Sequence, residues 1–269
     1  MCPTRDAGIV QRWLSPWAGC FWAATSSFLA YILIQVCSLL SPRFAPKSPC
    51  QSIKSLLLLV INPMREYILI TVLTALTLTF GFYATDQYMA LQLSKGIHFW
   101  KPSLPWDTLI PLRPGWIWIY LSYFPICFFP VIFTEIWKDI RLFRRTALGF
   151  ILQFAVALAF FWIVPSQMER LIFHPNSLSE EALAWFYKID AGFNVFPSLH
   201  IANITYTACL AWRFRKKALS IGVWVLCALI ALSTLFVKQH YFLDLPAGCL
   251  LGLLGYKACF PKALQTLTG

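Results

Sequence analysis

The feature that most constrains this chain is a series of long intervals that contain no Asp, Glu, Lys or Arg. Each interval is about 20 residues or longer, which is the length that an α-helix needs to cross a bilayer. The intervals cover residues 13–42, 67–85, 114–134, 146–168, 191–212 and 218–237, and a seventh apolar stretch, 241–256, contains one charge. We therefore predict an all-α, polytopic membrane helix bundle: six helices preceded by one N-terminal transmembrane helix.

The composition supports this interpretation and excludes several classes of protein. Hydrophobic residues make up 59% of the 269 positions, whereas charged residues make up only 12%, about half the share in an ordinary soluble domain. A disordered chain, a nucleic-acid-binding domain and a water-soluble enzyme are all excluded by this balance. In a soluble protein the net charge of +11 would suggest nucleic-acid binding. It has a simpler explanation here, because Lys and Arg accumulate in the cytoplasmic loops of membrane proteins.

The distribution of charge along the chain predicts its orientation. Three connecting segments, 43–65, 138–145 and 213–217, are rich in Lys and Arg. They alternate with segments 86–113 and 169–190, in which basic residues are sparser or are offset by acids. Basic loops remain on the cytoplasmic side, so the first set is expected to be cytoplasmic. The C-terminus is then cytoplasmic and, with seven spans, the N-terminus lies outside.

These assignments divide the chain into three parts. Residues 1–65 form the N-terminal transmembrane helix and a cytoplasmic loop, 66–258 form the six-helix membrane domain, and 259–269 form a cytoplasmic tail. The apolar run 56–61 is too short to cross a bilayer. We expect it to form a turn at the interface that ends at Asn62-Pro63.

Three ionisable residues lie where a membrane helix should carry none. His200, His240 and Asp244 are placed at the starts of neighbouring spans, on the side that the charge pattern assigns to the outside. Ionisable groups in a membrane segment are costly and usually functional. Asp244 follows His240 by four residues, so on one helix the two side chains would share a face. The carboxylate would then fix the imidazole tautomer and raise the basicity of the other ring nitrogen.

The residues before His200 predict a binding site for an anion. Pro197 suits the first turn of a helix, and the free N–H groups of Ser198, Leu199 and His200 would then face outward. A helix N-terminus of this kind binds phosphate readily. Lys238 and Arg170 are expected on the same side. We infer displacement at phosphorus, with one histidine as nucleophile and the other as general acid. The two rings should then face each other across a gap that holds one phosphate, at most ~10 Å apart.

These residues resemble two motifs of the type 2 phosphatidic acid phosphatase superfamily, which contains membrane lipid phosphatases and phosphotransferases. Its P-S-x-H motif is matched by Pro197-Ser198-Leu199-His200. Its S-R-x-x-x-x-x-H-x-x-x-D motif resembles the segment from Ser233 to Asp244. The resemblance covers roughly residues 66–258 and implies a six-helix catalytic core. It further implies that His240 attacks phosphorus, that Asp244 orients it, and that His200 protonates the leaving oxygen.

The chain also departs from the family pattern. Thr234 replaces the motif arginine, and Lys238 could supply its charge. In the degenerate first motif, K-x-x-x-x-x-x-R-P, Arg170 keeps the arginine's place, whereas Ile163 and Leu171 replace the lysine and the proline. The resemblance implies that Lys238, Arg170 and the Ser198-Leu199 segment hold the phosphate oxygens. The P-S-L-H and K-Q-H-Y-x-x-D strings are more similar to the branch that contains inositol phosphorylceramide synthase and sphingomyelin synthases.

The outer segment 86–113 is rich in Trp and Pro. An aromatic belt at the interface explains this composition, and a lid over a lipid entry site is the sharper alternative. We assign lipid-entry or headgroup contacts to Arg113, Trp106, Tyr241 and Asn194. A lipid phosphate is the expected substrate and the bilayer the expected environment. The sequence suggests no metal, no cofactor, no nucleic acid and no obligate protein partner.

The sequence leaves several alternatives open. The acceptor of the phosphoryl group is either water or a lipid alcohol, so the chain is either a hydrolase or a transferase. A proton-coupled transporter could use His200, His240 and Asp244 as a relay. However, a relay should lie near the bilayer midplane and such transporters often contain internal repeats, which this sequence does not show. An inactive scaffold would leave the charge of Asp244 unexplained.

Overall fold

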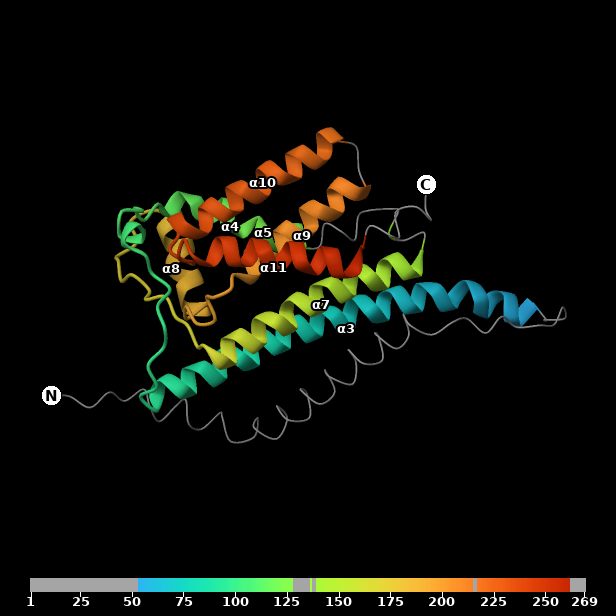
Figure 1. Ribbon diagram of the computed structural model, residues 1–269, viewed down its shortest axis with the longest axis horizontal. Coiled ribbons are helices and arrows are strands. Elements are labelled where there is room, and N and C mark those ends of the chain that lie inside the picture. The colour runs from blue at the N-terminus through green and yellow to red at the C-terminus, as the bar shows by residue number, and fades with distance from the viewer. Residues whose placement is uncertain (1–52, 128–135, 137–138, 215–216, 262–269) are drawn as a thin grey trace. The chain divides into compact units, whose positions relative to one another are not determined.

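The computed structural model describes residues 53–127, 136, 139–214 and 217–261, with side chains from residue 66 onward (Figure 1). These residues belong to one compact unit, which is described here by itself. The predicted first helix, at 13–42, lies outside the described residues, as does the end of the C-terminal tail. The described part of the chain consists of helices and loops with two isolated β-bridges and no strand. The all-α prediction is therefore confirmed for this part.

Five long helices form most of the described unit. They are α3 (Ile53–Ser94), α7 (Ile140–Ile163), α9 (Leu199–Phe214), α10 (Lys217–Phe236) and α11 (Asp244–Cys259). Within the described residues, three segments are long and apolar enough to cross a membrane: Glu66–Ser94, Ile140–Ile163 and Lys217–Phe236. Each coincides largely with a predicted span. The structure therefore fits a membrane protein, and the count of six helices plus one stays a prediction.

Short helices connect and cover the long ones. They are the α-helices α4 (Ile117–Leu121), α5 (Tyr123–Cys127) and α8 (Leu178–Ile189), with the 3-10 turns η1 (Pro105–Thr108) and η2 (Pro114–Trp116). Helix α8 lies in the outer segment 169–190, where no helix was predicted. The hydroxyl of Ser177 accepts from the Glu180 amide, and the Glu180 carboxylate accepts from the Asn176 amide. Ser177 and Glu180 have the S-x-x-E spacing of a capping box, which is a sequence signal for this helix.

Two predictions about helix boundaries were wrong. The run 56–61 is not a turn, because α3 continues without a break through Asn62-Pro63. A proline costs a helix one hydrogen bond, but membrane helices tolerate it. The predicted span at 114–134 is not one uninterrupted helix in its described part, since α4 and α5 are separated at Ser122. Pro125 has no N–H to donate to the carbonyl of Leu121, which weakens the helix at this point.

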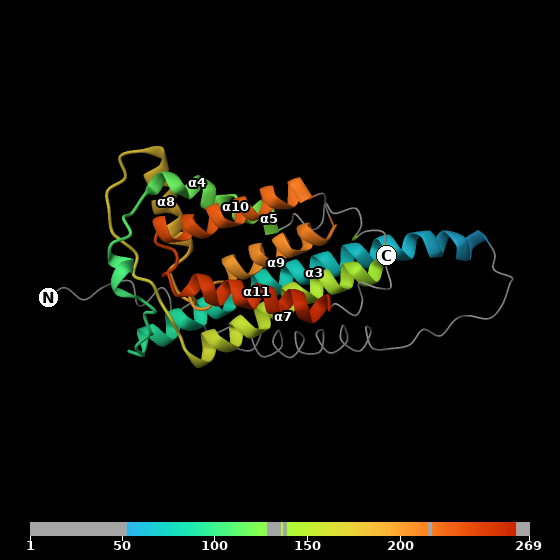
Figure 2. The ribbon, with the colours of Figure 1, turned by 45° about the horizontal axis from the view of Figure 1, so that its top comes forward.

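Helix α9 lies among the other long helices and contacts α7, α10 and α11, while α3 packs along α7 (Figure 2). Most side chains of α9 are buried. The contact with α11 is close because α11 presents glycines at the crossing. A Cβ atom built on Gly248 would lie 2.5 Å from the backbone oxygen of Ser198, and one on Gly252 would lie 2.4 Å from that of Ala202. Small residues of this kind let membrane helices approach each other closely.

The close approach of α9 and α11 predicts that Gly252→Ala destabilises the protein. The added methyl group would meet a backbone carbonyl, which cannot move aside as a flexible side chain can, and overpacking of this kind costs about 1–3 kcal/mol. The control is Gly222→Ala in α10, where an added Cβ meets nothing within 4 Å. Melting temperature in detergent should fall for the first variant and hold or rise slightly for the second. Equal melting temperatures would contradict this account of the helix contact.

Candidate active site

Two histidine rings lie against each other at the ends of neighbouring helices. His200 is in the first turn of α9, and His240 is in the loop 237–243 that joins α10 to α11. The Nδ1 atom of His200 is 3.1 Å from the Nε2 atom of His240, and the ring centroids are 5.2 Å apart. The expected proximity of the two rings is therefore confirmed. The expected open gap between them is not present, because the rings are in direct hydrogen-bonding contact.

The partners of His240 determine which of its nitrogens is free to react. Its Nδ1 atom is 3.0 Å from the carbonyl oxygen of Val195 and 3.1 Å from Oδ2 of Asp244. Both partners are acceptors, so Nδ1 carries the proton and Nε2 has the lone pair. Nε2 lies 3.0 Å from the hydroxyl of Ser198. Burial lowers the pKa of His240 to about 4, so the ring is neutral at pH 7 and the lone pair is available.

Asp244 makes the expected contact with His240 by a different local geometry. The two residues were expected to share a helix face, but α11 begins at Asp244 and His240 precedes it in the loop. A turn closes the loop instead: Oδ2 of Asp244 also accepts from the amide of Tyr241 at 2.9 Å. The carboxylate is fully buried, and its Oδ1 atom has no hydrogen-bond partner among the described residues. The Asp244 carboxylate thus orients the His240 ring and also stabilises the loop that carries it.

His200 has a partner that the sequence did not identify. The hydroxyl of Tyr120, a fully buried residue of α4, lies 2.8 Å from Nε2 of His200. With Nε2 accepting from Tyr120, the His200 Nδ1 atom carries the proton that faces His240. The ring of Tyr123 also packs against His200, with centroids 4.4 Å apart. Both tyrosines lie in an aromatic run that resembles an interfacial belt, so nothing in the sequence marks them.

Arg170 lies beside the histidines, but most of its N–H groups donate to acceptors within the protein. Its guanidinium forms an ion pair with Asp190 at 2.7 Å and donates to the carbonyl of Lys238 and to Oε1 of Gln239, both at 2.8 Å. It also donates to the carbonyl of Asp190 at 3.1 Å. Arg170 therefore joins the end of α8 to the loop that carries His240. Its predicted role as a phosphate ligand stays a prediction.

Lys238 points away from the histidines. Its ammonium donates to the carbonyls of Asp107 and Ile110, at 3.0 and 2.6 Å. The buried carboxylate of Asp107 accepts from the Phe242 amide at 2.8 Å, and the Arg113 amide donates to the carbonyl of Phe236 at 2.9 Å. The outer segment is thus fastened to the loop 237–243. In this structure Lys238 supports that loop and is not among the residues that line the cavity beside the histidines.

Of the remaining predicted site residues, some lie at the histidine pair and others lie in the outer segment. Ser198 and Leu199 lie beside the histidine pair, but the Ser198 amide points toward the carbonyl of Asp244 at 3.5 Å. Pro197 precedes α9 by two residues and is not in its first turn. The expected row of free N–H groups is therefore incomplete. Trp106 packs edge-on against Phe242 in the outer segment, whereas Asn194 lines the small cavity at the histidines.

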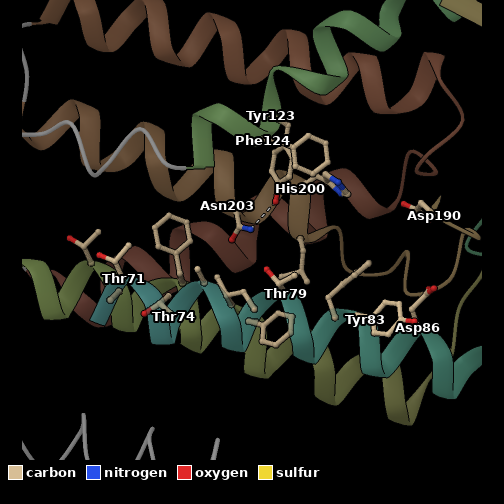
Figure 3. Close-up of a pocket in the computed structure, with 18 of the residues that line it drawn as sticks. Thr71, Thr74, Thr79, Tyr83, Asp86, Tyr123, Phe124, Asp190, His200 and Asn203 are labelled. Atoms are coloured by element: carbon tan, nitrogen blue, oxygen red, sulfur yellow. Dashed lines mark hydrogen bonds between the residues drawn. The ribbon is translucent and has the colours of Figure 1, made fainter. Parts of the chain in front are cut away.

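Two cavities meet at His200. The larger, of about 540 Å³, is mainly apolar and is lined by residues of α3, α5, α7 and α9 (Figure 3). Asp86 and Asp190 lie at one end of it, and Asn203 donates to the hydroxyl of Tyr123 in its wall at 3.0 Å. The smaller cavity is lined by both polar and apolar residues and lies beside the two histidines and Arg170. His200, Leu199, Asp190 and Phe82 line both cavities.

Comparison with known proteins identifies a family for the region that contains this site. Residues 113–258, more than half of the chain, match the family model of the PAP2 superfamily. The matched region contains both histidines, Asp244, Tyr120 and Arg170. No curated protein and no solved structure matched the chain. The match supports an enzyme with phosphatase-type chemistry, since members of this superfamily are generally phosphatases or phosphotransferases, and it gives no support to a transporter. The chain belongs to the PAP2 superfamily.

Proposed function

We propose that this protein is an integral-membrane lipid-phosphate phosphatase or phosphotransferase that works through a phosphohistidine intermediate. The observation that carries the proposal is the orientation of His240. Both partners of its Nδ1 atom are acceptors, so the lone pair of Nε2 faces Ser198 and His200. A neutral, buried imidazole with a fixed tautomer and an adjacent proton donor has what nucleophilic catalysis at phosphorus requires.

The reaction would proceed in two displacements. Nε2 of His240 attacks phosphorus, and the bond from phosphorus to the leaving oxygen breaks. His200 takes up a second proton when the anionic phosphate binds; it then gives its Nδ1 proton to the leaving oxygen and becomes neutral, which requires this N–H to turn from His240 to the substrate. In the second displacement, His200 takes the proton of an acceptor hydroxyl, whose oxygen attacks phosphorus while the phosphorus–nitrogen bond breaks. The acceptor is water in a phosphatase and a lipid alcohol in a transferase.

The larger cavity supports a lipid as the substrate. Its volume is about 540 Å³, and Leu78, Phe82 and Phe154 are among the apolar residues that line it. Because His200 lies in its wall, a hydrocarbon chain in the cavity would bring an attached phosphate ester to the histidines. Phospholipids and isoprenoid or sphingolipid phosphates share this combination of an apolar chain and a phosphoryl group. The bilayer is then both the environment of the enzyme and the source of its substrate.

Two finer assignments belong to the same proposal. The positive-inside pattern of the sequence favours an extracytoplasmic position, either periplasmic or lumenal, for the start of α9 and the loop 237–243. The P-S-L-H and K-Q-H-Y-x-x-D strings favour the branch similar to inositol phosphorylceramide and sphingomyelin synthases, and therefore transfer of a phospho-headgroup between lipids.

The direct test is an assay with labelled phospholipids. Purified protein is incubated with the lipids in detergent, with and without ceramide or diacylglycerol as acceptor. Release of a water-soluble phosphate product in both conditions identifies a phosphatase, and a new labelled phospholipid that appears only with the acceptor identifies a transferase. His240→Ala protein is the control for contaminating activity. Absence of both products across these lipid classes would contradict the proposed function.

The two histidines should have separable roles. His240→Ala removes the nucleophile, so turnover and any acid-labile phosphoenzyme should be lost. His200→Ala should mainly slow departure of the leaving group, which needs a proton when it is an alkoxide. An activated aryl phosphate ester, whose leaving group needs no proton, should therefore partly restore the first displacement in this variant. Equal loss on natural and activated substrates would contradict the assignment of His200 as general acid.

Asp244→Asn tests whether the carboxylate serves the reaction as well as the fold. The amide oxygen can still accept from Tyr241 and from the ring, but it no longer stabilises the positive charge that develops on His240. We expect turnover to fall by about 10²-fold, on the scale by which positioned acid–base groups contribute. Melting temperature should hold or rise slightly, because a buried charge has been removed. Near-normal turnover would reduce Asp244 to a structural residue.

A further inference from the structure

We propose that the side-chain amides of Asn194 and Gln239 hold the phosphoryl oxygens while His240 attacks, in the place where cationic side chains were expected. This inference rests on the proposed function and names the groups that bind its substrate. It is carried by two buried amides with unused hydrogen-bonding atoms that line the same small cavity as both histidines.

Asn194 is held beside His240 with its side chain unpaired. It is 4% exposed, and neither Oδ1 nor Nδ2 has a hydrogen-bond partner among the described residues. Its backbone has a φ of 59°, a region that Asn enters more readily than most residues. Its backbone N–H donates to the carbonyl of Ser166 at 3.0 Å. The next residue, Val195, supplies the carbonyl that binds His240. The Asn194 side chain is therefore held one residue before Val195, whose carbonyl orients His240.

Gln239 has an amide whose direction is determined by Arg170. It is 2% exposed, and its Oε1 atom accepts from the Arg170 guanidinium at 2.8 Å. Because the oxygen faces the guanidinium, the NH₂ group faces away from it. Nε2 has no partner among the described residues. Gln239 thus offers donors beside the nucleophile that follows it in the chain.

Buried amides without partners are unfavourable in a folded protein, so two of them in one cavity point to a ligand that supplies acceptors. Phosphoryl oxygens are such acceptors. As it stands the smaller cavity has room for about one water, so the phosphoryl group would lie at its junction with the larger cavity, where His200 lines both. Of the expected cations, Lys238 binds two carbonyls of the outer segment and does not line this cavity, whereas Arg170 lines it but is already paired with Asp190.

The test uses isosteric substitutions and orthovanadate, which mimics a phosphoryl group in transit between an oxygen and the attacking nitrogen. Asn194→Asp keeps the size of the side chain and tolerates the positive φ. Gln239→Glu keeps the oxygen that Arg170 binds. Each replaces NH₂ donors by an acceptor, so the inhibition constant for orthovanadate and the KM for the lipid should rise by about 10-fold or more, on the scale of a hydrogen bond to a charged group. Asn176→Asp, in an exposed loop, is the matched control.

Melting temperature is measured beside inhibition to separate binding from folding. Asn194→Gly is the second variant, since glycine adopts the positive φ freely and removes the amide altogether. Weaker vanadate inhibition of Asn194→Gly and Gln239→Glu at unchanged melting temperature would support the proposal. Unchanged inhibition in either variant, or a loss fully matched by unfolding in both, would overturn it. Wild-type protein that neither turns over lipid phosphates nor binds vanadate would instead overturn the proposed function on which it rests.

Discussion

The hydrogen bonds at Nδ1 of His240 are the interaction on which the rest of the site depends. One acceptor, Asp244, begins α11, and the other, the carbonyl of Val195, lies in the segment that leads into α9. A single imidazole N–H therefore connects the two closely packed helices at the end where the candidate chemistry lies. This arrangement places the opposite nitrogen beside His200. A change in the position of either helix end would alter the direction of the lone pair.

The surrounding loops are fixed by charges that would otherwise be assigned to substrate binding. Arg170 connects the end of α8 to the loop 237–243, and Lys238 connects that loop to the outer segment. Both side chains end on backbone carbonyls, which are abundant in irregular segments and need donors when they are buried. In this protein the basic residues stabilise the framework of the site. The neutral amides of Asn194 and Gln239 line the small cavity at the histidines together with the Arg170–Asp190 pair.

The sequence predicts the central part of the site well, because the motif spacing brings His200, His240 and Asp244 to one place in any bundle with short connections. It does not predict which backbone geometry makes the contact, since a separation of four residues suits both a helix and the turn found here. Helix α8 contains charged residues and is amphipathic, so it does not form a charge-free interval, although Ser177 and Glu180 signal its start. The role of Tyr120 depends on the packing of α4 against α10 and α8, which local sequence does not encode.

The close contact between α9 and α11 has a consequence for how this enzyme can vary. Ser198 makes two contacts at once. Its carbonyl oxygen would lie 2.5 Å from a Cβ built on Gly248, and its hydroxyl lies 3.0 Å from Nε2 of His240. A larger residue at position 248 would push on the same residue that contacts Nε2 of His240. A substitution that alters the helix packing at this point is therefore also expected to move a group in contact with His240. We expect stability to be tuned at sites far from this crossing.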